Sequence, residues 1–202
     1  GIAKYDYLAV AKPIDSASVI GFSYLRFGVD NIPNTTELID NNGNVDYNRI
    51  TTFSATDNAF LLSYARRMKV PGLRLGANAK VIYRNVGPFA KAWGFGLDAG
   101  LQYDRGHWRF AAVGRDITGT FNAWSYTLDQ RTKDVFAQTG NELPVNGVEA
   151  TLPRLVLGVA RGFQIGSKVD LLVEADLENT FDGKRNTVIA SDTWSSDPRL
   201  GL

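Results

Sequence analysis

The chain of 202 residues contains no cysteine and a single histidine, His107. Without cysteine, disulfide bonds and thiolate metal sites are excluded. With one histidine, in a predicted tight turn, neither a Ser–His constellation nor a histidine metal site is available. No apolar run approaches the roughly 18–20 residues of a transmembrane helix. The 22 basic and 21 acidic residues nearly cancel, and no basic run suggests a nucleic-acid partner.

No signal peptide is visible at the start of the given sequence. The first ten residues carry Lys4, Tyr5 and Asp6 where such a peptide has its apolar centre. We therefore expect the chain to start after processing, or part-way through a larger protein.

What is present is a side-chain period of two. Between residues 73 and 84, one set of alternate positions is mainly apolar and the interleaved set is mainly polar; the apolar set is Leu73, Leu75, Ala77, Ala79, Val81 and Tyr83. The pattern returns between residues 95 and 104, again with aromatic residues at the ends. A period of two predicts strands with one apolar face. The strand length and the terminal aromatics are typical of transmembrane β-barrels.

Comparable patterns predict eight strands in all, at residues 5–12, 18–29, 58–68, 73–84, 95–104, 108–115, 154–163 and 168–178. The predicted connections alternate between short turns and longer polar segments. Outer-membrane barrels have short periplasmic turns and long extracellular loops, so the alternation favours an all-β, up-and-down antiparallel transmembrane β-barrel. We interpret residues 1–202 as a single barrel domain that lacks N- and C-terminal strands.

The longest predicted connection, residues 116–153, includes a candidate helix. Thr127 and Gln130 have capping-box spacing, and Asp129 suits the positive N-terminal end of a helix. Gly140 is well placed to end it in a left-handed conformation. We predict a short extracellular helix here.

The polar faces of the predicted strands carry charges of both signs, which we expect to line the barrel lumen. Unpaired charges in a narrow barrel are costly, so pairing across the lumen is expected. No group that would complete an acid–base site accompanies the paired carboxylates, so we expect no enzymatic activity and no cofactor. The predicted lumen-lining residues are Arg74, Lys80, Arg84, Asp98, Asp104, Asp170, Glu174 and Asp176. They form either a structural network or a selective passage.

Two motif-like stretches are better explained without a ligand. The glycines at 94 and 96 loosely match a dinucleotide fingerprint, but they lie inside a predicted strand and no helix follows. The oxygen-bearing residues Asp40, Asn42, Asn44 and Asp46 resemble a calcium loop. Val45 and Thr51 occupy the positions where that loop needs glycine and glutamate, which favours a solvated surface loop.

The segment from Arg115 to Trp124 combines polar residues with large aromatic ones. We predict that it is too irregular for a lipid-facing strand and lies at the barrel rim or over its mouth. Its aromatic rings either form a small core with Leu128 and Phe136 or dock a partner protein. The predicted partner-binding residues are Arg115, Asp116, Phe121, Asn122 and Trp124.

Four stretches resemble the PorV/PorQ-like outer-membrane proteins of Bacteroidota, relatives of the FadL-type barrels. They are residues 21–30, 93–101, 114–124 and 152–155, and the Arg-Asp-Ile-Thr…Phe-Asn-Ala-Trp stretch is the most specific. The resemblance spans nearly the whole chain. It implies a barrel of about fourteen strands in the outer membrane. It also implies a role in type IX secretion, with the translocon barrel and the C-terminal domains of exported proteins as partners.

Three functions from different classes follow. The first is a non-enzymatic secretion partner that binds exported cargo or the translocon through extracellular loops. The second is a FadL-like transporter of small hydrophobic molecules. The third is a soluble barrel such as a lipocalin, whose apolar faces would point inwards; alternation alone does not distinguish inside from outside.

Overall fold

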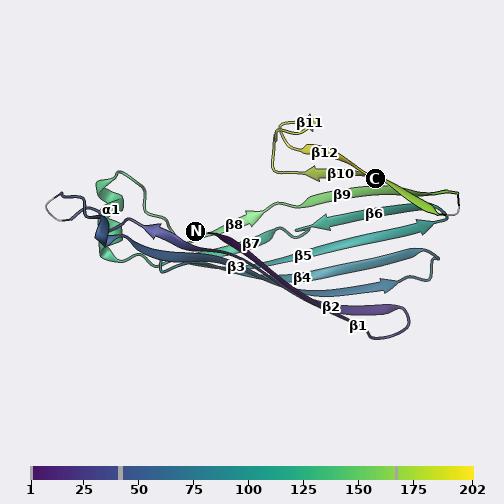
Figure 1. Ribbon diagram of the computed structural model, residues 1–202, viewed down its shortest axis with the longest axis horizontal. Coiled ribbons are helices and arrows are strands. Elements are labelled where there is room, and N and C mark those ends of the chain that lie inside the picture. Colours follow the sequence, from purple (N-terminus) through teal and green to yellow (C-terminus); the bar gives the residue numbers. More distant parts are fainter. Residues whose placement is uncertain (1, 41–42, 167) are drawn as a thin grey trace.

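The computed structural model describes residues 2–40, 43–166 and 168–202. It is a curved, twisted sheet of antiparallel strands with one α-helix at one end (Figure 1). The long strands are β1 (Ala3–Pro13), β2 (Ser18–Asn34), β3 (Thr51–Arg67), β4 (Leu73–Val86), β5 (Ala90–Arg105), β9 (Arg154–Ile165) and β10 (Val169–Thr180). The shorter ones are β6 (Trp108–Arg115), β7 (Thr120–Tyr126), β8 (Gly147–Thr151), β11 (Ile189–Ala190) and β12 (Ser195–Gly201). A 3₁₀ turn, η1, covers Tyr47–Arg49, and the helix α1 covers Gln130–Gln138.

The sheet has up-and-down topology and is open. Its strands follow the order β1-β2-β3-β4-β5-β6-β9-β10-β12-β11, while β7 pairs with β5 and β8. All eight predicted strands are present, and several extend beyond their predicted bounds. Among the described strands none joins β1 to the opposite edge, so a closed barrel is not seen.

One predicted connection was wrong, because residues 116–153 contain two further strands. β6 and β7 pair with successive parts of β5. On their other side, β6 pairs with β9 and β7 pairs with β8. β6 and β7 are in effect one long strand with a break at residues 116–119, and β8 and β9 are another with a break at residues 152–153. Asp116 (φ 54°) and Gly119 (φ 69°) have left-handed backbone at the first break.

The connections alternate less strictly than predicted. At the end opposite α1, residues 14–17, 68–72 and 106–107 make short turns, and β9 ends at Ile165 shortly before β10 begins at Val169. At the α1 end the connections are long, except that residues 87–89 form a tight turn. There Gly87 takes φ 51° and the Phe89 N–H donates to the Val86 carbonyl.

The register of the strands places opposed residues on a common side of the sheet. Between β4 and β10, the apolar face is defined by Leu75, Val81, Trp93, Phe95, Leu101, Trp108, Phe110, Phe121, Val148, Leu157, Phe163 and Leu171. The polar face is defined by Arg74, Lys80, Arg84, Gly94, Gly96, Asp98, Thr120, Asn122, Trp124, Glu149, Arg154, Glu174 and Glu178.

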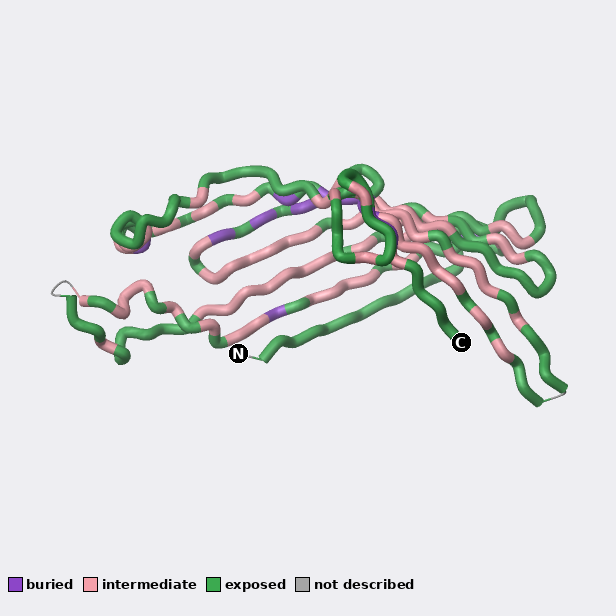
Figure 2. Tube along the Cα trace, turned by 90° about the horizontal axis from the view of Figure 1, so that it is seen from above, coloured by how far each residue is buried: buried purple, intermediate pink, exposed green. Residues whose placement is uncertain are grey.

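Burial is inverted relative to a soluble protein. Most large side chains of the apolar face as defined above are exposed, for example Trp93 by 60% and Phe95 by 52%. On the polar face Ala92 is 1% exposed and Asn122 is 4% exposed. Buried segments are few in Figure 2, and most buried residues are polar. The apolar side chains therefore do not form the interior.

Candidate functional site: a polar network and an apolar cavity on one face

A buried ion-pair network lies at the break between β6 and β7. The Lys80 ammonium on β4 lies 2.7 Å from an Asp98 carboxylate oxygen and 2.5 Å from an Asp116 carboxylate oxygen. The Asp116 N–H donates to Asp98 at 2.8 Å, and the Thr120 hydroxyl donates to the Asp116 carboxylate. The charged side chains are 14%, 13% and 8% exposed. The network therefore fixes the conformation of the break.

Small residues on β5 make this network possible. Gly96 is opposite Lys80 in the register, and a Cβ there would overlap the Thr120 hydroxyl and lie 2.7 Å from the Lys80 Cε. The lysine side chain thus reaches across β5 to the next strand. Gly94 has the same role beside Asn122, whose amide oxygen its Cβ would overlap.

A second row of contacts crosses the polar face closer to the helix. The Arg84 guanidinium contacts the two Asp57 carboxylate oxygens, at 3.0 and 3.2 Å. It also stacks 5.1 Å from the Trp124 ring and lies 3.6 Å from the Glu149 carboxylate. The Trp124 indole N–H donates to Glu149 at 2.9 Å. Arginine reaches β8 here because the intervening β5 residue is Ala92.

An apolar cavity of about 400 Å³ lies beside this row, between the polar face and α1. Aromatic and aliphatic side chains dominate its lining, with two threonines as the polar groups. It is lined by Thr36, Val86, Phe89, Ala90, Trp124, Tyr126, Leu128, Thr132, Phe136 and Pro144. The volume and the lining fall within the usual range for a small-molecule pocket.

The helix is held over the cavity by its caps and by one arginine. The Asp129 carboxylate accepts from the Thr132 N–H at 2.7 Å, and this hydrogen bond lowers the pKa of Asp129. Arg131 contacts Glu37 at 3.5 Å and the Ile39 carbonyl at 2.7 Å, so α1 is tied to the loop after β2. Gly140 takes φ 69° just beyond the helix, as the sequence predicted.

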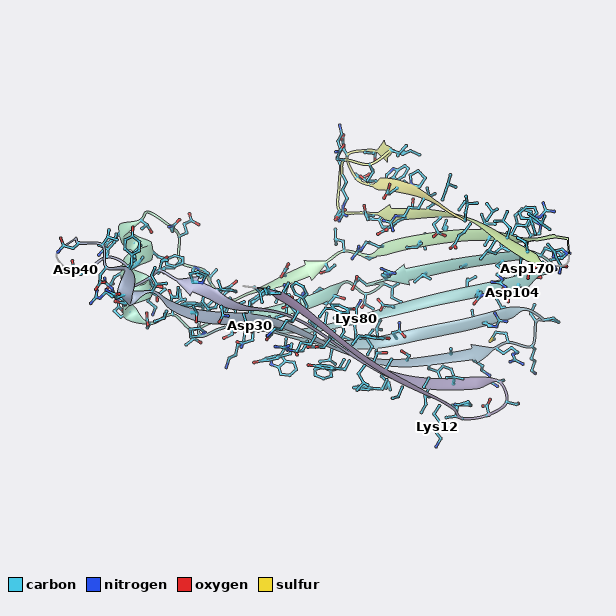
Figure 3. All side chains as sticks on the ribbon, viewed as in Figure 1. Lys12, Asp30, Asp40, Lys80, Asp104 and Asp170 are labelled. Carbon is cyan, nitrogen blue, oxygen red and sulfur yellow. The ribbon has the colours of Figure 1, made fainter. Side chains whose placement is uncertain are left out.

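The eight predicted lumen-lining residues all share the polar face, but their pairing differs from the prediction. Arg74 pairs with Asp104 at 2.8 Å, Lys80 with Asp98, and Arg84 with Asp57. These are pairs between adjacent strands, not across a lumen. No ion pair forms at Asp170, Glu174 or Asp176 within the described part of the chain. Figure 3 shows the polar and apolar side chains along the sheet.

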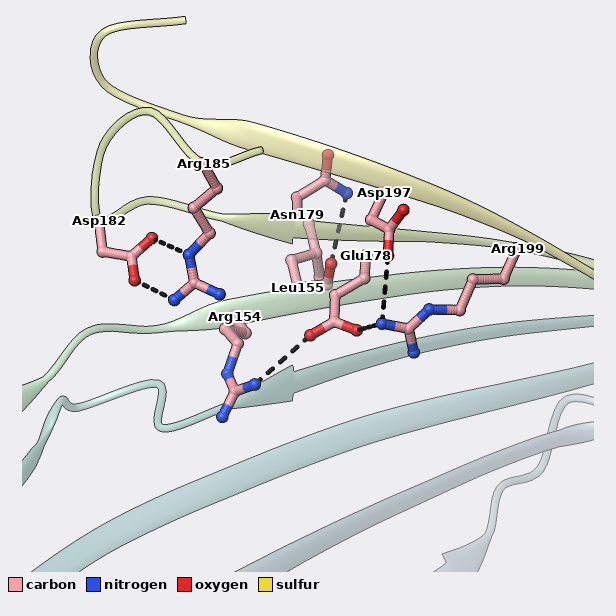
Figure 4. A network of polar contacts seen from close by, with 8 residues as sticks. All are labelled: Arg154, Leu155, Glu178, Asn179, Asp182, Arg185, Asp197 and Arg199. Atoms are coloured by element: carbon pink, nitrogen blue, oxygen red, sulfur yellow. Dashed lines mark hydrogen bonds and ion pairs between the residues drawn. The ribbon is translucent and has the colours of Figure 1, made fainter. Parts of the chain in front are cut away.

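Sequence reasoning missed a cluster at the β9–β10–β12 edge (Figure 4). Glu178 accepts from two arginines, Arg199 at 2.6 Å and Arg154 at 3.5 Å. Arg199 also lies 3.4 Å from Asp197. Nearby, Arg185 and Asp182 form a separate ion pair in the loop after β10. Arg154 opposes Thr180 and Glu178 opposes Val156, so the ion pair is diagonal and the spacing along the sequence carries no signal for this cluster.

The structure separates the five predicted partner-binding residues. The prediction of irregular backbone was wrong from Thr120 onwards, because β7 is a regular strand. Phe121 lies on the apolar face, whereas Trp124 lies on the polar face and lines the cavity with Leu128 and Phe136. Two rings on opposite faces cannot form one surface.

The remaining members of that set are also apart. Asp116 and Asn122 are buried, and Arg115 is exposed at the end of β6. A docking role for these five residues stays a prediction. Because they lie on different faces of the sheet, a partner would have to contact them through separate surfaces.

The two motif-like stretches have structural explanations. Gly94 and Gly96 lie within β5, as predicted, and no helix follows. Of the calcium-like loop, Asn42 lies outside the described residues. The Asp40 carboxylate accepts from the Asn44 N–H, and Asp46 caps η1. Over residues 2–40, 43–166 and 168–202, no cluster of three potential metal ligands is found.

Among those same residues, no helix is both long and apolar enough to cross a membrane. Comparison with known proteins adds no relative: no family model, curated protein or solved structure matches the chain.

Proposed function

We propose that this chain forms the wall of an outer-membrane β-barrel and has no enzymatic activity. The observation that carries the proposal is the exposure of the apolar face from β4 to β10 while the opposite face buries ion pairs. Water-soluble proteins rarely expose contiguous apolar surface of this extent. A lipocalin-like barrel would instead enclose its apolar side chains, and the Lys80 network occupies the face that such a barrel would fill with them.

Within the membrane, the proposed role is in type IX protein secretion. The chain binds exported cargo or the translocon barrel at the end that carries α1 and the longer connections. The support for this role is the resemblance of residues 114–124 and the other quoted stretches to PorV-like proteins. Arg131 adds a physical reason, because it ties α1 to the loop after β2 and so stabilises one surface at that end.

A second candidate function is supported by the apolar cavity. Transport of a small hydrophobic molecule requires an apolar site near the mouth, and the cavity under α1 has the right lining and size for one. The two functions differ in what binds at the same end of the molecule.

The membrane proposal is tested with two adjacent residues of β9. Leu157 belongs to the apolar face and Val156 to the polar face. Leu157→Arg places a charge in hydrocarbon, at a cost of about 2–4 kcal/mol near the bilayer centre. We expect it to reduce assembly in lipid vesicles, measured by heat-dependent mobility in electrophoresis. Val156→Arg is the matched control and should assemble; equal yields for both would refute the orientation.

The two candidate functions are separated by filling the cavity. Ala90 is buried and lines it, so Ala90→Phe should block entry of a small molecule. Ala99→Phe, on the apolar face, is the control. If transport is the function, Ala90→Phe abolishes recovery of a co-purified lipid-like compound from native membranes. If secretion is the function, both variants recover exported protein and the translocon barrel as the wild type does.

A further inference from the structure

Charge on the apolar face is of one sign. From β4 to β10 the register assigns no aspartate or glutamate to this face, and its charged residues are Lys91, Arg105 and Arg161. Two of these three cations lie near the short turns at the end opposite α1. The face is therefore apolar in its middle and cationic at one margin.

The two arginines lie in one row across three strands. Trp108 on β6 is opposed to Arg105 on β5 and to Arg161 on β9. Adjacent strands are about 4.8 Å apart, so the two arginine backbones are separated by about 10 Å. Side chains of this length can converge on one small anion above Trp108.

The Arg161 guanidinium is held by aromatic rings and not by an acid. It stacks 5.0 Å from the Trp108 ring and 4.9 Å from the Phe163 ring. Within the described residues, neither Arg161 nor Arg105 has a carboxylate within ion-pair distance. The nearest acids along the strands are Asp104, next to Arg105, and Glu174, next to the Val173 that opposes Arg161; both belong to the polar face. The stacked guanidinium thus keeps its N–H edge available for an external anion.

The surroundings match the boundary between hydrocarbon and headgroups. Trp108 stacks with Phe110 at 6.2 Å, and Phe110 with Tyr103 at 6.5 Å. Aromatic side chains form such girdles at membrane interfaces. A surface hollow beside the row is lined by Tyr103, Arg105, Trp108 and Phe110. An acyl chain in this hollow would contact aromatic side chains and lie next to the Arg105 guanidinium.

We propose that Arg105 and Arg161 bind the phosphate of an anionic phospholipid, whose acyl chain lies along the Tyr103–Phe110 hollow. The proposal rests on the membrane location proposed above. Guanidinium groups bind phosphate through paired, charge-assisted hydrogen bonds. A lipid with net negative charge is favoured over a zwitterionic one, because two arginines face it and no acid on this face offsets them.

The experiment measures retained lipid on the purified, refolded chain. The chain is assembled in nanodiscs of phosphatidylglycerol and phosphatidylcholine, extracted into detergent, and analysed by native mass spectrometry. We expect wild type to retain phosphatidylglycerol over phosphatidylcholine. Arg105→Gln/Arg161→Gln should lower that retention about tenfold, as expected for losing charge-assisted hydrogen bonds. The matched control is Arg109→Gln, on β6 beside Trp108 but on the polar face; it should retain lipid as the wild type does.

Each alternative outcome is decisive. Unchanged phosphatidylglycerol retention in the double variant would overturn the site. If the double variant does not assemble, the proposal is tested by the lipid preference of the wild-type chain. Equal retention of phosphatidylglycerol and phosphatidylcholine by the wild type refutes the proposal. Insertion is scored separately by heat-dependent mobility. A wild-type chain that fails to insert would overturn the membrane location and the lipid site together, whereas insertion without lipid preference overturns only the site.

Discussion

Gly96 shows how one residue without a side chain controls the polar face. Its missing Cβ leaves room for the Lys80 side chain and the Thr120 hydroxyl. We predict that Gly96→Ala destabilises the folded state by about 1–3 kcal/mol, the usual cost of overpacking. Gly100→Ala is the control, because a Cβ there would meet its nearest neighbour at 3.4 Å. Urea unfolding in lipid vesicles measures both; equal midpoints would contradict the assigned contacts.

The ion pairs that Lys80 and Arg74 of β4 form with aspartates differ in burial, and this predicts different contributions to stability. Lys80→Met leaves the Asp98 and Asp116 carboxylates without their cation, which typically costs about 3–5 kcal/mol at a buried site. Arg74→Met breaks an exposed pair with Asp104 and should cost less than about 1 kcal/mol. The same unfolding measurement compares them. A larger loss in Arg74→Met would show that the Lys80 network is not a stabilising element.

For single residues, the sequence predicts on which face of the sheet a side chain lies better than it predicts which residue that side chain contacts. A period of two places Lys80 and Asp98 on one side of the sheet, whichever residues oppose them. The contact between Lys80 and Asp116 depends on the left-handed backbone at Asp116, and no periodic pattern encodes that. Glu149 and Glu178 were missed for a related reason: each is reached by an arginine from a non-opposed position, so the spacing along the sequence carries no signal.

Among the elements, β7 was missed because its strand pattern follows a break. After Gly119 the polar-face residues Thr120, Asn122 and Trp124 alternate with Phe121 and Ala123, so a period of two was present in the sequence. This pattern was overlooked because residues 116–119 have a turn-like composition. Such a composition suggests a connection between two elements and not an interruption within one strand. The strand 108–115, bounded by a tight turn and this break, was predicted with its observed bounds.

The helix α1 allows a prediction about pH. A hydrogen bond from the Thr132 N–H lowers the pKa of Asp129 in the folded state. A carboxyl group with a depressed folded pKa contributes stability above its unfolded pKa and loses it as pH falls through the folded pKa. We therefore expect the protection of amides in residues 130–138, measured relative to their intrinsic exchange rates, to decrease as the pH falls below about 4.

Two substitutions at this position check the cause. Asp129→Asn keeps a capping oxygen and should remove the pH dependence while α1 stays protected at neutral pH. Asp129→Ala should expose α1 to exchange at neutral pH as well. If Asp129→Asn keeps the acid-induced change, another group is responsible for it.

For the whole molecule, the arrangement of an exposed apolar face and a polar opposite face does not extend to the edge of the sheet formed by β1 and β2. On β1 and β2 the side that continues the apolar face carries two ion pairs, Lys4 with Asp30 at 2.7 Å and Asp6 with Arg26 at 3.1 Å. Charges in hydrocarbon are costly. In a barrel we therefore expect this corner to be covered by protein or to lie at the water boundary, while β4 to β10 face lipid.

The last prediction concerns the two ends of the molecule. Every connection at the α1 end, including the loops around Gly140 and Gly183, should lie on the cell surface, because outer-membrane barrels place their long loops outside. The turns at Gly106 and Gly166 should then face the periplasm. Epitope tags inserted at these four glycines, which all have positive φ in turns or loops, test this with antibody labelling of intact and permeabilised cells. Gly140 and Gly183 should label in both, and Gly106 and Gly166 only after permeabilisation. Labelling at Gly106 on intact cells would invert the topology, and it would move the Arg105–Arg161 lipid site to the outer leaflet.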